Sequence, residues 1–181
     1  READGAAAGL RPGVSYPVSE FPLEEVSITE LHAGMVSGRW SSEEITRLYL
    51  KRIQEIDGQG PTLRSLIETN PDALEIAAQR DGERREGRVR GCLHGIPILV
   101  KDNVATHDRM TTTAGSWALE GSIPPQDSGV ARKLREAGAS LMILEGKESQ
   151  LTTGSWKIEN EERLPFSENR WIRLYSPLCF T

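Results

Sequence analysis

The stretch of sequence that decides the fold is Leu93-His94-Gly95-Ile96-Pro97-Ile98-Leu99-Val100-Lys101-Asp102-Asn103. Its centre, Ile96–Val100, is a continuous apolar run of strand length with no polar alternation. Such a run is typical of a strand buried on both faces, as in a sheet sandwiched between helices. Three polar residues follow at once, and open α/β sheets place their sites at the carboxyl ends of such strands.

Lys101 is the candidate catalytic residue in this stretch. A lysine at a strand end usually extends its ammonium group to water, and that interpretation needs no function. If the strand instead delivers the side chain to a dry pocket, desolvation lowers the pKa of the amine until it can accept a proton. Ser116 is a second candidate, but no G-x-S-x-G turn surrounds it, which favours a turn serine over a nucleophile.

The residues before this strand predict two helices. Ser27 and Ser41 are each followed three residues later by Glu, the capping-box pattern of a helix start. From Ile45 to Ile56 apolar residues recur at helical spacing, and we expect that helix to end near Asp57-Gly58, where glycine can adopt the left-handed conformation.

Further segments predict two more strands and two more helices. Leu63–Glu68 predicts a strand, and Asn70-Pro71 predicts a third helix with Asn70 as its N-cap. Asp127-Ser128 predicts the cap of a fourth helix, closed by Gly138, and Ser140–Leu144 predicts another buried strand. Strand, capped helix and strand form the pattern of a βαβ crossover, so the predicted fold class is α/β.

Composition excludes several classes of function. The 181 residues carry 22 basic and 27 acidic side chains, and this acidic balance without a long basic block argues against nucleic-acid binding. No apolar run approaches the ~18 residues of a membrane span. Acids and bases alternate from Arg80 to Arg90, which favours a solvated helix face over an anion-binding surface. Cys92 and Cys179 form no CxxC pair and the three histidines lack ligand spacing, so we expect no metal and no cofactor.

The chain divides into three parts by composition. Residues 1–22 are rich in Gly, Ala and Pro and predict a flexible N-terminal arm, residues 23–147 carry the predicted helices and strands, and residues 148–181 form an aromatic-rich, divergent tail without a period. The chain begins at Arg1 rather than Met, which favours a secreted protein if a signal segment was removed and a cytoplasmic one otherwise.

The opening stretch, together with Thr112-Thr113-Ala114-Gly115-Ser116, closely resembles the amidase signature family. Supporting similarity lies in Ser41-Ser42-Glu43, Ile67-Glu68-Thr69-Asn70-Pro71 and Leu134-Arg135-Glu136-Ala137-Gly138-Ala139. The resemblance covers about residues 21–147. It implies the N-terminal part of the family's fold, a mixed sheet covered by helices, which is incomplete in this chain.

The resemblance also implies a hydrolase of C–N amide bonds that uses a Ser–cisSer–Lys triad and takes a small-molecule or peptide amide. Lys101 matches the family's lysine, which acts through a bridging serine in a cis peptide. That serine relays the proton of a nucleophilic serine, which attacks the carbonyl and forms an acyl-enzyme. Backbone N–H groups of a glycine-rich loop hold the oxyanion.

One departure from the family pattern concerns the nucleophile. Both family serines belong to a Gly/Ser-rich segment, and no G-S-S-x-G segment occurs after Lys147. The serines of the tail have no such context: Ser149, Ser155, Ser167 and Ser176. We therefore expect a chain truncated before its nucleophile and inactive alone. The alternative is a non-catalytic interaction protein that retains part of the amidase fold, because exposed aromatic residues mark binding surfaces.

Overall fold

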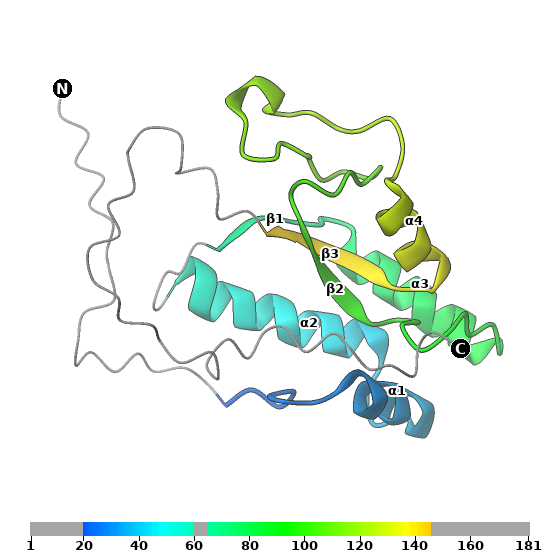
Figure 1. The fold of residues 1–181 in the computed structure, drawn as a ribbon. Coiled ribbons are helices and arrows are strands. Elements are labelled where there is room, and N and C mark those ends of the chain that lie inside the picture. Colours follow the sequence, from blue (N-terminus) through cyan, green and yellow to red (C-terminus); the bar gives the residue numbers. More distant parts are fainter. Residues whose placement is uncertain (1–19, 60–64, 146–181) are drawn as a thin grey trace, which may run out of the picture.

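The computed structural model of this chain describes residues 20–59 and 65–145 (Figure 1). The segment 148–181 and most of the N-terminal arm lie outside the described residues. Phe21, at the end of that arm, makes an edge-on contact with the ring of Tyr49 at a centroid distance of 5.1 Å.

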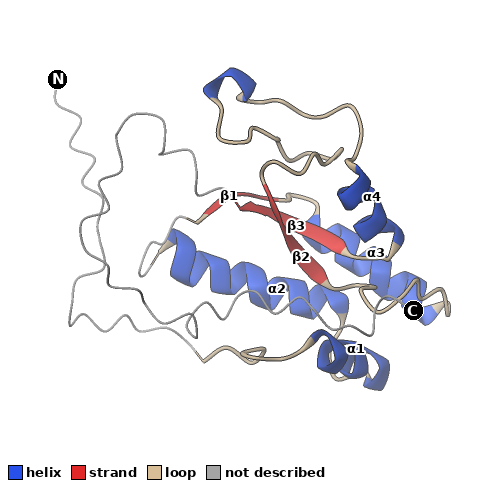
Figure 2. Ribbon diagram, in the orientation of Figure 1, coloured by secondary structure: helices blue, strands red, loops and turns tan. Residues whose placement is uncertain are grey.

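In the described part of the chain, three strands form one mixed sheet in the order β1-β3-β2. β1 (Leu66–Thr69) runs antiparallel to β3 (Ser140–Glu145), and β2 (Pro97–Lys101) runs parallel to it. Within residues 20–59 and 65–145, four α-helices accompany the sheet (Figure 2): α1 (Ile28–Ser37), α2 (Ser42–Ile53), α3 (Ala73–Arg85) and α4 (Gly129–Glu136). The predicted α/β class and the mixed sheet covered by helices are confirmed.

One hydrophobic core joins the helices to the sheet. α2 packs against α3 and β2, while α3 and α4 both pack against β3. Because β2 and β3 are parallel neighbours with α4 between them in sequence, the predicted βαβ unit is present. The main buried cluster comprises Leu23, Leu31, Met35, Ile45, Ile96, Ile98, Val100, Met110, Ala131, Ala139 and Leu141.

The two capping boxes form as the sequence predicts. The hydroxyl of Ser27 accepts from the Glu30 N–H at 3.2 Å, and the Glu30 carboxylate accepts from the Ser27 N–H at 2.8 Å. Ser41 and Glu44 repeat the arrangement at 3.0 and 2.7 Å. Both pairs are local in sequence, which is why the pattern alone identifies them.

Two predicted helix ends are wrong in detail. Asn70 is not the N-cap of α3, because Asp72 occupies that position. The Asn70 side chain accepts from the Asp72 N–H at 2.9 Å and donates to the carbonyl of Leu141 at 3.0 Å, so it joins the turn to β3. A single π-helical turn, Gln54–Gly58, continues α2, so the helical segment ends at Gly58 as predicted, but Gly58 is not left-handed.

The prediction that β2 is buried on both faces is also wrong. Ile98 and Val100 are each 7% exposed and belong to the core, whereas Leu99 between them is 41% exposed. Successive side chains of a strand point to opposite faces, so only one face of β2 is covered by the described residues.

No helix within residues 20–59 and 65–145 is long and apolar enough to cross a membrane.

Candidate functional site at the carboxyl end of β2

Lys101 is the last residue of β2 and its side chain is exposed. Its backbone pairs in register with Glu145 of β3, and the chain then turns, with the Val104 N–H donating to the Lys101 carbonyl at 2.8 Å. The lysine therefore stands at the rim of the sheet. The dry surroundings that a lysine base requires are not supplied by the described residues.

Asp102 connects the end of β2 to the loop that carries Thr113 and Gly115. The residue is 3% exposed, and its carboxylate accepts from the Thr113 N–H at 2.8 Å, the Thr113 hydroxyl at 2.6 Å and the Gly115 N–H at 3.3 Å. In this loop Ala114 adopts a φ of 48° and Gly115 a φ of 73°. Left-handed backbone is costly for alanine, so these hydrogen bonds hold the loop in a conformation it would otherwise avoid.

β1 holds the same loop from the other side. The Glu68 carboxylate accepts from both the N–H and the hydroxyl of Thr111, each at 2.9 Å. The loop between β2 and α4 is long and largely irregular, yet it is fixed by carboxylates at both edges of the sheet. Long ordered loops of this kind are usually functional.

The start of the same stretch is fixed by α2 and by the end of α4. The hydroxyl of Ser42 donates to the Gly95 carbonyl at 2.6 Å, and the Gly95 N–H donates to the Gly138 carbonyl at 2.9 Å. Gly138 has φ +84°, and a Cβ added to it would lie 2.5 Å from Nδ1 of His94. Each sequence string that resembles the amidase family therefore contacts β2 or one of its neighbours.

His94 is a structural residue rather than a ligand or base. Its ring is fully buried, with Nε2 3.0 Å from the Arg80 carbonyl and Nδ1 accepting from the Arg90 N–H at 3.4 Å. Burial lowers the pKa of His94, and the neighbouring Arg84 acts in the same direction. A neutral imidazole that donates from Nε2 satisfies both contacts.

The charged segment 80–90 does more than face solvent, which corrects the sequence-based interpretation. The Asp81 carboxylate accepts from the N–H groups of Ser42 and Glu43, at 2.7 and 3.0 Å, and so caps α2 from another helix. Glu83 pairs with Arg80 and Arg90. Burial acts to raise the pKa of Glu83, but the hydrogen bonds from these two guanidinium groups outweigh it, and the pKa is lowered overall.

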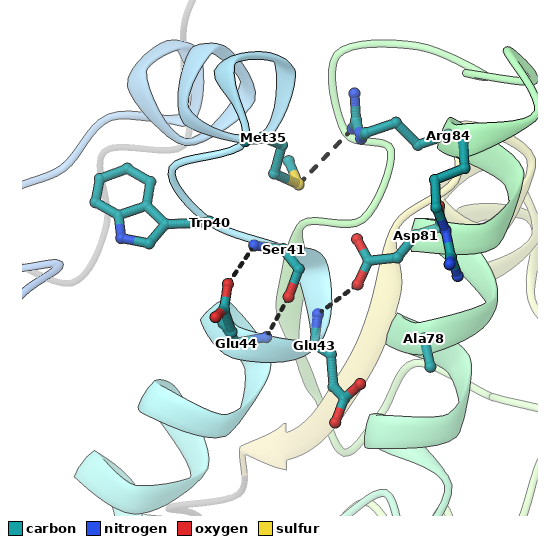
Figure 3. Close-up of a pocket in the computed structure, with 10 residues that line it drawn as sticks. Met35, Trp40, Ser41, Glu43, Glu44, Ala78, Asp81 and Arg84 are labelled. Carbon is teal, nitrogen blue, oxygen red and sulfur yellow. Dashed lines mark hydrogen bonds between the residues drawn. The ribbon is translucent and has the colours of Figure 1, made fainter.

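An open pocket lies between α1, α2 and α3, lined by residues that include Met35, Trp40, Asp81 and Arg84 (Figure 3). Asp81 caps α2 there, and Arg84 donates to the His94 carbonyl at 2.9 Å. These polar groups thus serve the fold, and Lys101 is not among the lining residues.

Lys101 directly precedes Asp102, which anchors the loop that carries Thr113 and Gly115. The structure does not place Ser116 as a nucleophile. Ser116 is exposed and its N–H donates to the Thr113 carbonyl at 2.9 Å, the turn serine that the sequence favours. Sequence reasoning missed the anchoring roles of Asp102 and Glu68. The available signal was that both occur inside strings that resemble the amidase family. Within the described part of the chain, no group of three or more His, Cys, Asp or Glu could hold a metal ion.

The fold and this site define an α/β protein with a lysine at the carboxyl end of β2 and an anchored Thr/Gly loop beside it. A sequence profile of the family described as Amidase matches residues 44–147, more than half of the chain. The chain belongs to the amidase family.

Known relatives agree with this assignment. A Schizosaccharomyces pombe protein named as an amidase is 48% identical over 119 residues, which is 66% of this chain and 20% of the relative. An Arabidopsis thaliana protein that is also named as an amidase is 40% identical over 126 residues, which is 68% of this chain and 24% of that protein.

Solved structures give the same fold. The peptide amidase of Stenotrophomonas maltophilia matches with a TM-score of 0.67 and 48% identity, over 70% of this chain and 26% of that one. An amidase family protein of Bacillus anthracis matches with a TM-score of 0.65 and 40% identity, over 69% of this chain and 25% of that one. The chain spans only 20% and 24% of the length of the two curated relatives described above.

Proposed function

We propose that this chain contributes the lysine of an amidase that hydrolyses C–N amide bonds, and that these 181 residues alone do not complete the reaction. The supporting observation is the position of Lys101 at the carboxyl end of β2, next to Asp102 and the loop that Asp102 anchors. Family membership supplies the reaction class. The absence of a G-S-S-x-G segment from the sequence supports the inactivity of the chain by itself.

In the proposed mechanism the neutral amine of Lys101 takes the proton of a bridging serine, which takes the proton of the nucleophilic serine. The nucleophilic serine attacks the amide carbonyl, and the amine of the substrate leaves with a proton. Water then releases the acid from the acyl-enzyme. A neutral amine needs desolvation, and Lys101 is exposed among the described residues. The proposal therefore requires that other segments cover Lys101 in the complete site. The substrate class is a small-molecule or peptide amide.

A chimera tests this proposal. Residues 21–147 replace the matching segment of the Stenotrophomonas maltophilia peptide amidase, and release of ammonia from a peptide amide is measured. We expect the chimera to be active and Lys101→Ala to lower kcat by about 10²- to 10⁴-fold, the usual contribution of a general base. Lys101→Arg should be equally impaired, since arginine stays protonated.

The exposed Lys133 of α4 provides the matched control, and Lys133→Ala should leave kcat unchanged. A chimera that retains full activity with Lys101→Ala would contradict the role of Lys101. Turnover by the purified 181-residue chain, lost with Lys101→Ala, would contradict its proposed inactivity.

A further inference from the structure

Arg135 of α4 joins the two ends of the loop between β2 and α4, residues 102–128. Its Nε donates to the carboxylate of Asp127 at 3.0 Å, and its Nη2 donates to the carboxylate of Asp108. Asp108 lies near the start of the loop and Asp127 at its end. The three side chains are between 12% and 25% exposed, so solvent screens these ion pairs less than fully exposed ones.

The two carboxylates also fix the backbone of the loop. Oδ1 of Asp108 accepts from the N–H of Met110 at 2.9 Å, and Met110 is fully buried in the core. Oδ1 of Asp127 accepts from the N–H of His107 at 2.7 Å, so the end of the loop is bonded to its start. Each carboxylate therefore uses one oxygen for the loop backbone and the other for Arg135.

The turn at residues 113–115 lies between these two ends of the loop. It bonds to Asp102, the residue that follows Lys101. The N–H of Thr112 donates to the carbonyl of Ser122 at 2.8 Å, so the loop also closes on itself. Figure 1 shows the loop rising beyond the carboxyl end of β2 and returning to α4. A shift of either end of the loop would therefore reach the turn and the strand end that carries Lys101.

We infer that Arg135 is a positioning residue of the proposed amidase: it holds both ends of the β2–α4 loop and thereby fixes the turn at residues 113–115 against the end of β2, where Lys101 stands. The inference rests on the proposed function. Position matters because a displacement of about 1 Å at the reacting groups can lower the rate about a hundredfold, even when the substituted residue is far from them.

The first experiment measures hydrogen exchange in the full 181-residue chain. In Arg135→Ala the amides of Thr113 and Gly115 should exchange about tenfold faster, because opening the loop no longer breaks its charged hydrogen bonds to Arg135. Millimolar guanidinium chloride should restore the protection, since the free cation can bind between the two carboxylates. Sodium chloride at the same concentration should not restore it.

The second experiment measures activity in the chimera with the peptide amidase. Arg135→Ala should lower kcat by about 10- to 100-fold and leave KM nearly unchanged, because Arg135 does not bind the substrate. Guanidinium should raise kcat of this variant. Arg135→Lys should recover little activity, since an ammonium group lacks the planar fork of donors that meets two carboxylates.

Arg132→Ala is the matched control. Arg132 is an exposed arginine of the same helix that pairs with Glu136, so its loss should change neither the exchange at residues 113–115 nor kcat. Thermal melts of all variants report folding. If Arg135→Ala does not fold, Asp108→Asn takes its place, because it removes one charge but keeps an oxygen for the N–H of Met110. Exchange at residues 113–115 should accelerate in that variant too.

Three results would overturn the inference: unchanged exchange at Thr113 and Gly115 in the folded variants, a raised KM with unchanged kcat, or equal losses in Arg132→Ala. Losses that guanidinium does not reverse would assign them to general damage and would also overturn it. A chimera that is inactive without any substitution would count against the proposed function. The exchange experiment would still decide whether Arg135 fixes the turn, so the two failures are distinguishable.

Discussion

The two ends of β2 differ in how completely the described residues surround them. At the start of the strand, His94 and Ile96 are buried, and Gly95 is bonded to both Ser42 and Gly138. At the end, Lys101 and Leu99 are exposed, whereas Val100 and Asp102 are buried. The described residues therefore enclose the start of β2, and the chemistry that we propose lies at its more exposed end.

A large effect is expected from filling the close contact at the start of β2. Gly138→Ala puts a methyl group 2.5 Å from Nδ1 and 3.0 Å from Cα of His94, in a left-handed backbone. Left-handed strain and overpacking together should lower the free energy of unfolding by about 3 kcal/mol. Urea denaturation of the full chain measures this loss.

Gly87→Ala separates the two causes. Gly87 has φ +75° but nothing lies within 4 Å of its added Cβ, so only backbone strain applies, about 1 kcal/mol. Equal losses in the two variants would show that the contact between Gly138 and His94 contributes nothing.

Removing the Asp102 carboxylate at the end of β2 should lower the free energy of unfolding slightly less. Asp102→Ala leaves the donors of Thr113 and Gly115 without their carboxylate, and loss of such buried hydrogen bonds lowers stability by about 2–3 kcal/mol. Asp102→Asn keeps an acceptor and should lose less. Hydrogen exchange at Thr113 and Gly115 should accelerate in the alanine variant, and unchanged exchange there would refute the anchoring role.

A pH-dependent loss of stability is expected from His94, at the start of β2. Because burial lowers the pKa of His94, the unfolded chain binds a proton at this residue more readily than the folded one. Stability from the neutral ring is present above the unfolded pKa of about 6.5 and is lost as pH falls toward the lower folded pKa. Urea titrations between about pH 7 and pH 5 should show this decline.

His94→Gln should remove the decline, because glutamine does not titrate. The groups around the ring include Arg80, Arg84, Arg90 and Glu83. Glu83 has a lowered pKa, so its own contribution is lost only below the ordinary carboxyl range near 4.5. A decline that persists in His94→Gln would assign it to another group.

The same contrast explains how far sequence reasoning reached. The capping boxes at Ser27 and Ser41 and the left-handed Gly138 are local, so their patterns predict them. The cap that Asp81 provides to α2 joins residues 39 apart in sequence, and no local pattern reveals it. Similarly, the hydrogen bond from Asn70 to Leu141 depends on β3, and no local pattern reveals it. The N-cap of α3 is Asp72, two residues after the predicted Asn70.

At the site, sequence reasoning found Lys101 but not what surrounds it. The strings that carry Glu68, Asp102 and Thr113 are separate in sequence, and only the fold brings them to one loop. The exposure of Leu99 could not be predicted either, because the run Ile96–Val100 is apolar on both faces. A continuous apolar run indicates a strand that can be covered on both faces, and the described residues cover only one of them.

The smallest expected effect is therefore the most informative about the two faces of β2. Ile98→Ala removes a side chain that is 7% exposed in the core and should cost about 2–4 kcal/mol. Leu99→Ala, one residue away, removes a side chain that is 41% exposed and should change the free energy of unfolding by about 0.5 kcal/mol or less. Urea denaturation of the isolated chain measures both. Equal costs in the isolated chain would mean that the exposed face is already covered without a partner.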